Sequence, residues 1–415
     1  MNANELVNEA LNALAAGKSA EALATAQKVL EAAPGDAGAW FLMGTVLVAR
    51  GEHEKALEAL EKSIKVDGQE ASTWFQKGLA HERLGQPPLA IDAYTRATQL
   101  DPEHAAAWRH LGFVLAADGQ HASALPAIRK AMELEPDLAG NAEAVALLCM
   151  ALYETGNPKE ARKVFEETTQ SRPALLENGY LRLQEAVVRN ILGEPEKALQ
   201  ALRKAEGSLT QPGELGLVRL QEGLAQQGLG EHEKAVGAFE KAAVLLPAGT
   251  ARSFVSLHRA RSHIALNDRP AANEALSHAE GEPGAPPRFF LQKAALLNTL
   301  GRATDALVDL DNLITQDPTS VDAWRLKAQS LVLGNRLAEA LDALGKAIEL
   351  ATDGPGKAPL WFDKVAVLSR KRDFQAALAA LDEVSSRDSN AEKVPLFLAL
   401  QCEEQRDLLG VRIPA

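Results

Sequence analysis

The stretch Trp108-Arg109-His110-Leu111-Gly112-Phe113-Val114-Leu115 carries the pattern from which the fold follows, because its apolar residues recur at the spacing of one helix face. Gly119 then supplies a tight turn, and a second apolar stripe of helical spacing starts at Ala124 and ends before Pro136. The small residues Gly112 and Ala124 allow two helices to cross closely, since a larger side chain would push them apart. Residues 108–136 therefore predict a closely packed helical hairpin.

The same arrangement repeats along the chain. Eleven alanines equivalent to Ala124 follow one another at spacings of 34 or 37 residues: Ala22, Ala56, Ala90, Ala124, Ala161, Ala198, Ala235, Ala272, Ala306, Ala340 and Ala377. A glycine stands five residues before eight of them: Gly17, Gly51, Gly85, Gly119, Gly156, Gly193, Gly230 and Gly301. All five tryptophans stand sixteen residues before such an alanine, which we call the tryptophan position: Trp40, Trp74, Trp108, Trp324 and Trp361. One hairpin of this kind cannot bury its apolar faces alone, so neighbouring hairpins must stack into a solenoid.

These residues resemble the tetratricopeptide repeat, whose pattern is W-x-x-L-G-x-x-Y followed by A-x-x-x-F, A and P. The resemblance covers about residues 3–389. It implies an all-α fold, a right-handed α-solenoid (superhelix) of helix-turn-helix repeats that runs through residues 1–415 as one continuous domain. The expected repeats are approximately 3–36, 37–70, 71–104, 105–138, 142–175, 179–212, 216–249, 253–284, 287–320, 321–354 and 358–390, followed by a capping helix over 391–410.

Some repeats depart from this pattern. Arginine or serine stands at the tryptophan position of repeats six to eight: Arg182, Arg219 and Ser256. Asn267 replaces the turn glycine of repeat eight. The runs 281–287 and 353–356, rich in proline and glycine, cannot continue a helix, and each is either a hinge or a stiff connection.

Composition limits the classes of function. The 415 residues include 44 basic and 56 acidic side chains, a net charge of −12, and an acidic chain repels the phosphates of a nucleic acid. Cys149 and Cys402 form no C-x-x-C pair, which argues against a disulfide scaffold or a cysteine zinc site. The longest apolar run, 144–153, is half the roughly twenty residues that cross a bilayer, and the N-terminus does not resemble a secretory signal. We therefore expect a cytoplasmic protein with no nucleic-acid partner and no direct membrane insertion.

Short stretches that resemble catalytic or metal-binding motifs are incomplete. Gly17-Lys18-Ser19 lacks the earlier glycine and the preceding strand of a phosphate-binding loop. His53-Glu54 and His232-Glu233 lack the second histidine of H-E-x-x-H, and both fall at helix starts. His104 and His110 straddle another helix start, where we expect solvent around them. We therefore expect no catalytic residue, no metal, no cofactor and no enzymatic activity.

A further stripe runs along each first helix, one, five and eight residues after the tryptophan position, and we call it the first-helix stripe. In tetratricopeptide proteins this stripe lines a concave groove where peptides commonly bind. The predicted partner-binding residues are Phe41, Phe75, Leu79, Arg109, Phe113, Met150, Arg261 and Arg325. Other members are Leu183, Val187, Leu220, Leu224, Leu257, Leu291, Gln329 and Phe362. Exposed apolar side chains with arginines are typical of a protein-binding surface, although neighbouring repeats would bury part of this one.

The sequence thus predicts a non-enzymatic scaffold or adaptor that binds a peptide or helical segment of another protein in its concave groove. The phenylalanines of the stripe would anchor the partner, and its three arginines would select acidic or polar groups. The alternative is a self-assembling, homo-oligomeric structural protein. For that alternative, the apolar residues Leu6, Val7 and Leu11 make the first helix a candidate contact surface.

Overall fold

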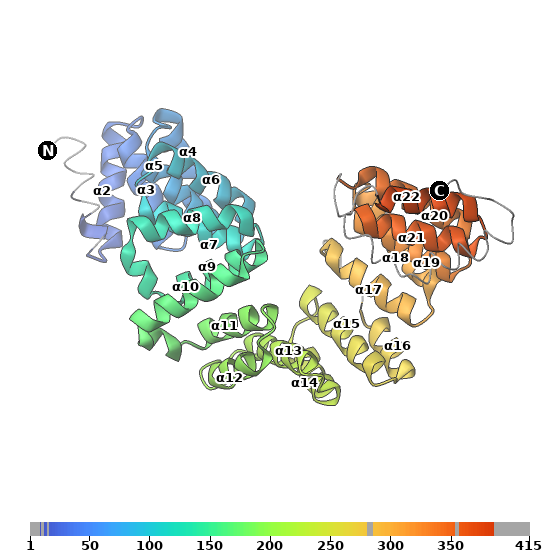
Figure 1. Ribbon diagram of the computed structural model, residues 1–415. Helices are drawn as coiled ribbons and strands as arrows, with labels where there is room; N and C mark the ends of the chain where they lie inside the picture. Colours follow the sequence, from blue (N-terminus) through green and yellow to red (C-terminus); the bar gives the residue numbers. More distant parts are fainter. Residues whose placement is uncertain (1–8, 10–11, 15, 280–284, 353–356, 386–415) are drawn as a thin grey trace. The chain divides into compact units, whose positions relative to one another are not determined.

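A computed structural model describes residues 9, 12–14, 16–279, 285–352 and 357–385, and every regular element among them is a helix (Figure 1). This confirms the predicted all-α class. The chain divides into two compact units, residues 1–211 and 212–415, and each is described by itself. One continuous right-handed solenoid remains a prediction. Several predicted features lie outside the described residues. They are the capping helix over 391–410, the apolar residues Leu6, Val7 and Leu11, and most of the Pro/Gly-rich runs 281–287 and 353–356.

The first unit consists of helix pairs joined by short turns. Its helices are α2 (Ser19–Ala32), α3 (Ala37–Ala49), α4 (His53–Val66), α5 (Ala71–Arg83), α6 (Pro87–Leu100), α7 (Ala105–Ala117), α8 (His121–Leu134), η1 (Pro136–Gly140), α9 (Ala142–Glu154), α10 (Pro158–Ser171), η2 (Pro173–Glu177), α11 (Gly179–Ile191) and α12 (Pro195–Glu206). The 3₁₀ turns η1 and η2 lie where the alanine spacing grows from 34 to 37 residues, so the additional residues form a connection there.

The second unit repeats the arrangement. Its helices are α13 (Pro212–Gly228), α14 (His232–Leu245), α15 (Thr250–Ala265), α16 (Arg269–Ser277), α17 (Pro287–Thr299), α18 (Ala303–Gln316), α19 (Val321–Leu333), α20 (Leu337–Leu350), α21 (Ala358–Arg370) and α22 (Phe374–Ser385). Helices α13 and α15 begin before the predicted starts of repeats seven and eight, residues 216 and 253. In these two repeats the additional residues lengthen the first helix by about one turn.

Contacts within each unit follow the order expected of stacked hairpins. Each first helix packs against its own second helix, as α3 does against α4 and α19 against α20. First helices of successive repeats also touch, as α7 touches α9 in the first unit and α15 touches α17 in the second. The apolar face of one hairpin is therefore covered by the next, which is the stacking that the repeat predicted.

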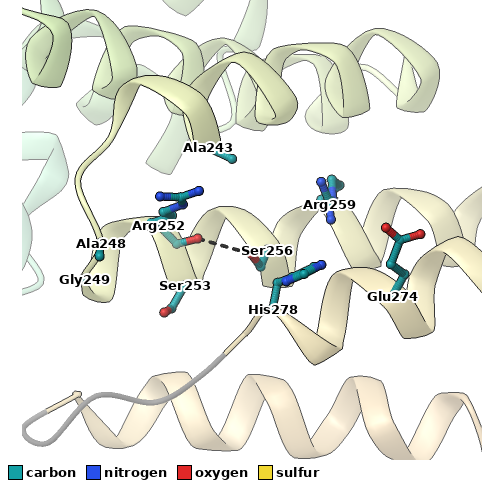
Figure 2. Close-up of a pocket in the computed structure, with 9 residues that line it drawn as sticks. All are labelled: Ala243, Ala248, Gly249, Arg252, Ser253, Ser256, Arg259, Glu274 and His278. Atoms are coloured by element: carbon teal, nitrogen blue, oxygen red, sulfur yellow. Dashed lines mark hydrogen bonds between the residues drawn. The ribbon is translucent and has the colours of Figure 1, made fainter.

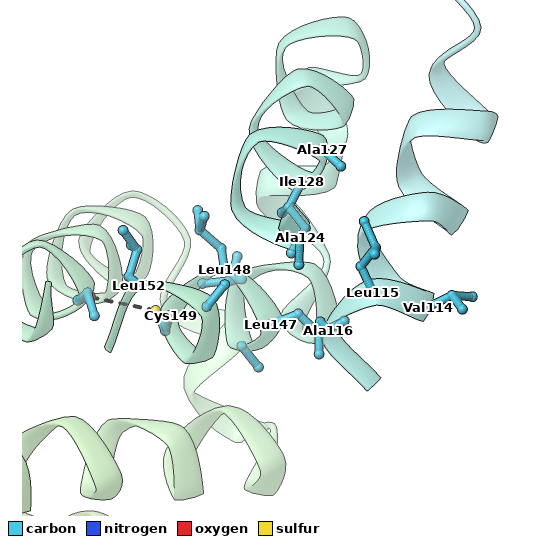
Figure 3. Close-up of a cluster of buried hydrophobic side chains, with 14 of the residues drawn as sticks. Val114, Leu115, Ala116, Ala124, Ala127, Ile128, Leu147, Leu148, Cys149 and Leu152 are labelled. Carbon is cyan, nitrogen blue, oxygen red and sulfur yellow. Dashed lines mark hydrogen bonds between the residues drawn. The ribbon is translucent and has the colours of Figure 1, made fainter. Parts of the chain in front are cut away.

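Close helix crossing explains the glycine eight residues into the repeat. A Cβ atom at Gly112 would lie 2.7 Å from Cγ1 of Ile128, and one at Gly78 would lie 2.5 Å from the ring of Tyr94. Ala124 is fully buried beside this crossing. Figure 3 shows Ala124 and Ile128 within the largest buried cluster of the first unit. The prediction that small residues mark the crossing is confirmed.

The turn between paired helices has one backbone shape throughout. All eight turn glycines adopt positive φ, from +68° at Gly85 to +83° at Gly156, a region that favours glycine. Asn267 takes the same shape with φ of +60° in repeat eight, and Asn335 and Arg372 do so in the last two repeats. The turn therefore keeps the same backbone shape even where no glycine is present.

Candidate functional site

Phe75, a predicted anchor of the first-helix stripe, lies at the edge of the core of the first unit. Its ring centroid is 4.9 Å from that of His104, 5.6 Å from that of His110 and 5.8 Å from that of Tyr94. The expectation that both histidines are solvated is wrong, because both are half-buried against this ring. His104 also caps α7, since its Nδ1 accepts a hydrogen bond from the backbone N–H of Ala107 at 3.2 Å.

A carboxylate completes this aromatic cluster. The hydroxyl of Tyr94 donates to Oε2 of Glu82 at 2.5 Å, and Nδ1 of His110 lies 3.0 Å from the same oxygen. Burial raises the pKa of Glu82, but the hydrogen bonds with His110 and Tyr94 outweigh burial and lower it overall. Burial, together with Glu82, raises the pKa of Tyr94. These polar groups satisfy one another, and their arrangement locks α5, α6 and α7 together.

The other apolar members of the first-helix stripe fall into two groups. Phe41, Leu79, Phe113 and Met150 are half-buried, so each keeps part of its side chain on the surface. Leu183, Leu220 and Leu257 are only 1%, 8% and 1% exposed. In repeats six to eight the residue after the tryptophan position is therefore part of the core, and the expectation of an apolar surface there is wrong.

Two of the three predicted arginines already have intramolecular partners. Nη1 of Arg109 lies 3.2 Å from Oε2 of Glu135, and Nε of Arg325 lies 2.6 Å from Oδ2 of Asp363. Arg261 is exposed and forms no ion pair with any residue that the structure describes. Arg261 is therefore the one of the three whose charge is unpaired.

The second unit has an apolar pocket of about 300 Å³ on the first-helix stripe. Its wall comes from α17, α19, α20 and α21: Asn298, Ala328, Gln329, Val332, Leu333, Leu344, Asp363, Ala366 and Val367. Of these residues, sequence reasoning singled out Gln329 alone. Ala366 stands at a stripe position, so a small residue among larger ones was the available signal of a hollow.

At the tryptophan position, two residues form a complementary pair. The indole N–H donates to the carbonyl six residues earlier, as from Trp108 to Pro102 at 2.8 Å and from Trp324 to Pro318 at 2.9 Å. A lysine three residues later lies over the ring in three repeats, with Nζ to centroid distances of 5.6, 5.2 and 4.8 Å for Lys77, Lys327 and Lys364. The lysine is thereby held in a cation–π contact.

In repeats six and seven the residue at the tryptophan position also contacts the residue three positions later, but the two form an ion pair. Nη1 of Arg182 lies 2.9 Å from Glu185, and Nη1 of Arg219 lies 2.8 Å from Glu222, three residues later in each case. Nε of Arg182 also donates to the carbonyl of Leu176, six residues earlier, as the indole does elsewhere. An ion pair has therefore replaced the ring and its cation.

Cys149 shows no sign of reactivity. It is 1% exposed, its Sγ lies 3.5 Å from the carbonyl oxygen of Ala161, and burial raises the pKa of its thiol to about 12. Among the described residues, no three His, Cys, Asp or Glu side chains gather as metal ligands would. None of the described helices is both long and apolar enough to cross a membrane.

Comparisons with known proteins agree with this architecture. Models of the tetratricopeptide repeat family match residues 13–74, 75–139, 115–177 and 291–356, more than half of the chain. The solved APC/C hetero-tetramer Cut9–Hcn1 is similar with 14% identity and a TM-score of 0.50, over 97% of this chain and 96% of that chain. A search of curated proteins finds no match.

Two further solved structures resemble parts of the chain. YrrB, described as a TPR protein with an unusual peptide-binding site, is 23% identical over 52% of this chain and 97% of its own, with a TM-score of 0.40. MamA is 26% identical over 40% of this chain and 90% of its own, with a TM-score of 0.36. Given the family matches, the stacked hairpins and the shared turn geometry, the chain belongs to the tetratricopeptide repeat family, a family of protein-interaction scaffolds.

Proposed function

We propose that this scaffold is non-enzymatic and binds a peptide or helical segment of a partner protein along its first-helix stripe. The observation that carries the proposal is the apolar pocket of about 300 Å³ on α17, α19, α20 and α21. Its size lies at the lower end of ligand pockets, which span roughly 300–1,000 Å³, and suits one apolar side chain of a partner. Gln329, an exposed stripe residue, lies in its wall and offers an amide to the partner's backbone.

Polar contacts support the walls of this pocket. Nδ2 of Asn298 donates to Oγ of Ser330 at 2.9 Å, which ties α17 to α19. The ion pair between Arg325 and Asp363 ties α19 to α21, and Asp363 itself lines the pocket. Because neighbouring first helices are joined in this way, the pocket is preorganised, and binding would require little ordering of the protein.

The test fills the pocket without cutting into the core. Ala366 is exposed and lines the pocket, so Ala366→Trp would place an indole in the space that the partner needs. Ala379→Trp, at an exposed position of α22, adds the same bulk away from the pocket. A quantitative pull-down from lysate of the source organism compares both variants with the full wild-type chain. A partner lost with Ala366→Trp and kept with Ala379→Trp is the expected result, and equal capture by both variants would contradict the proposal.

Self-assembly is the alternative outcome of the same variants. Sedimentation of the purified chain over a range of concentrations would show a mass that rises with concentration in the wild type. If that rise disappears with Ala366→Trp and no other protein is captured, the pocket serves a second copy of this chain. Substitution of Phe75 is less informative, because its ring packs on three others and its loss would disturb the fold.

A further inference from the structure

Repeat eight carries a second pocket, of about 460 Å³, on α14, α15 and α16 (Figure 2). It surrounds Ser256, which occupies the tryptophan position. Ser256 is 6% exposed, and its hydroxyl lies 3.4 Å from the carbonyl oxygen of Arg252, to which it donates. A small side chain bonded to its own helix therefore stands where other repeats place an indole, and the space around it is open.

The residues that flank a ring in other repeats have counterparts in this pocket. Arg259 stands three residues after Ser256, as the ring-contacting lysines Lys77, Lys327 and Lys364 stand after their tryptophans. His278 corresponds to Lys62, whose Nζ lies 4.2 Å from the ring centroid of Trp40 in repeat two. Both Arg259 and His278 line the pocket. Arg259 and His278 thus stand at two positions that contact an aromatic ring in other repeats, but repeat eight has no ring at the tryptophan position.

The pocket also carries unpaired positive charge. Arg252 and Arg259 form no ion pair with any described residue, and Figure 2 shows both side chains projecting from α15 toward the helix that bears Ala243. Glu274 of α16 is the one carboxylate among the lining residues, and it is not within ion-pair distance of either arginine. In repeats six and seven the charged residue three positions after the tryptophan position forms an ion pair, whereas Arg259 of repeat eight does not.

We propose that this pocket binds an aromatic side chain flanked by acidic residues in a segment of a partner protein. The ring would occupy the space over Ser256 against Arg259, in the cation–π contact that lysines make elsewhere in the chain. The acidic residues would pair with Arg252 and with the free face of Arg259. The site lies on other helices than the pocket at Gln329, so it stands or falls independently of the proposed function.

The probe is the peptide N-acetyl-Glu-(5-fluoro-Trp)-Glu-amide, followed by ¹⁹F NMR during titration with the full chain. We expect saturable broadening of the fluorine signal, weakened about tenfold by Arg259→Gln because its charge contacts both ring and carboxylate. Ser256→Trp should abolish binding, since the chain's own indole would then fill the pocket. Arg203→Gln removes an exposed arginine of α12 in the other unit and should leave binding unchanged. Circular dichroism of each variant reports whether its helices are intact.

Three results would overturn the proposal. The first is the absence of saturable binding to the wild-type chain, and the second is undiminished binding to both folded variants, Arg259→Gln and Ser256→Trp. The third concerns competition: if N-acetyl-Glu-Ala-Glu-amide or inorganic phosphate displaces the probe as well as unlabelled ring peptide does, the pocket is a simple anion site. Arg259→Gln keeps the test decisive even if the bulkier Ser256→Trp variant fails to fold.

Discussion

Repeats six and eight both lack the tryptophan, yet the space beside this position is largely filled in repeat six and left empty in repeat eight. In repeat six, Arg182 pairs with Glu185, and the pocket beside them measures about 120 Å³. In repeat eight, Ser256 and Arg259 form no hydrogen bond with each other, and the pocket beside them measures about 460 Å³. This part of the repeat can therefore be filled by an ion pair as well as by a tryptophan with a cation over its ring.

In repeat six this space is filled by a network of ion pairs between side chains that are mostly buried. Glu185 accepts from Arg182 at 2.9 Å and from Arg189 at 2.8 Å, and all three side chains are at most 13% exposed. Arg189 continues to Glu194 at 2.8 Å, and Glu194 also holds Arg162 of α10 at 3.0 Å. Every charge in the network therefore has an opposite charge, which is the condition for a buried ion pair to be tolerated.

The largest change in stability should come from disrupting this ion-pair network. Glu185→Gln leaves two poorly exposed guanidinium groups without their shared carboxylate, and we expect a loss of about 3–5 kcal/mol in the stability of repeat six. Hydrogen exchange of the amides of α11 measures it locally. Glu160→Gln is the control, because its pair with Arg129 is about half exposed and should be worth about 1 kcal/mol or less. Equal losses in the two variants would show that the network does not stabilise the repeat.

An effect of intermediate size should come from pH, because the stability of repeat eight, unlike that of repeat six, should depend on the protonation of a histidine. His258 in repeat eight stacks on Phe239 with 5.9 Å between ring centroids, and burial, assisted by Arg261, lowers its pKa from 6.5 to about 4. Between these values the unfolded chain binds the proton and the folded chain does not. Stability from this residue is thus complete above pH 6.5 and is lost as pH falls toward 4, by on the order of 2–3 kcal/mol.

Hydrogen exchange of α15 between pH 6.5 and 4, corrected for the intrinsic exchange rate, measures this loss. The network of repeat six contains no histidine, and its Glu194, whose pKa lies below the ordinary 4.5, loses its stabilising contribution only as pH falls toward and below that value, so α11 should show no corresponding loss between pH 6.5 and about 5.5. His258→Gln should remove the dependence from α15. A slope that persists in that variant would assign it to another group.

The smallest effect should come from closing repeat eight. Ser256→Trp supplies the missing ring against Arg259, and filling the pocket should stabilise the repeat by about 1 kcal/mol. Urea titration with exchange measured at α15 would detect the gain. Ser123→Trp, at an exposed position of α8, adds an indole on the surface and should change nothing. A loss of stability in Ser256→Trp would mean that the pocket is not shaped for an indole.

Local chemistry explains why so much of the fold could be predicted. The crossing of Gly112 with Ile128 and the turn at Gly119 depend on residues less than one repeat apart, and they recur with the period of the sequence. Helical spacing and a positive φ are properties of the backbone and of the nearest side chains, so a repeated pattern is sufficient to indicate them. Cys149, which stands twelve residues before Ala161 as Gly112 stands before Ala124, is likewise buried at a helix crossing.

The exposure of the candidate surface depends on residues from different helices. Arg109 is partnered by Glu135, 26 residues later, and Arg325 by Asp363, 38 residues later, so neither charge is as free as its position in the repeat suggested. Leu183 is buried by neighbouring helices although it belongs to the same stripe as half-buried Phe41. Side-chain availability is set by what the neighbouring repeat places opposite, and a pattern within one repeat does not contain that information.

The sequence of this chain was therefore sufficient for its all-α class, its helix pairs, their turns and their crossings, because those follow from periodic local interactions. The tertiary structure alone decided which stripe residues remain at the surface, that a pocket forms at Gln329, and that the residues around Ser256 leave a cationic hollow. Those features arise where side chains from different helices either meet or fail to meet. Packing between helices, which no single repeat specifies, produces the surfaces that a partner would contact.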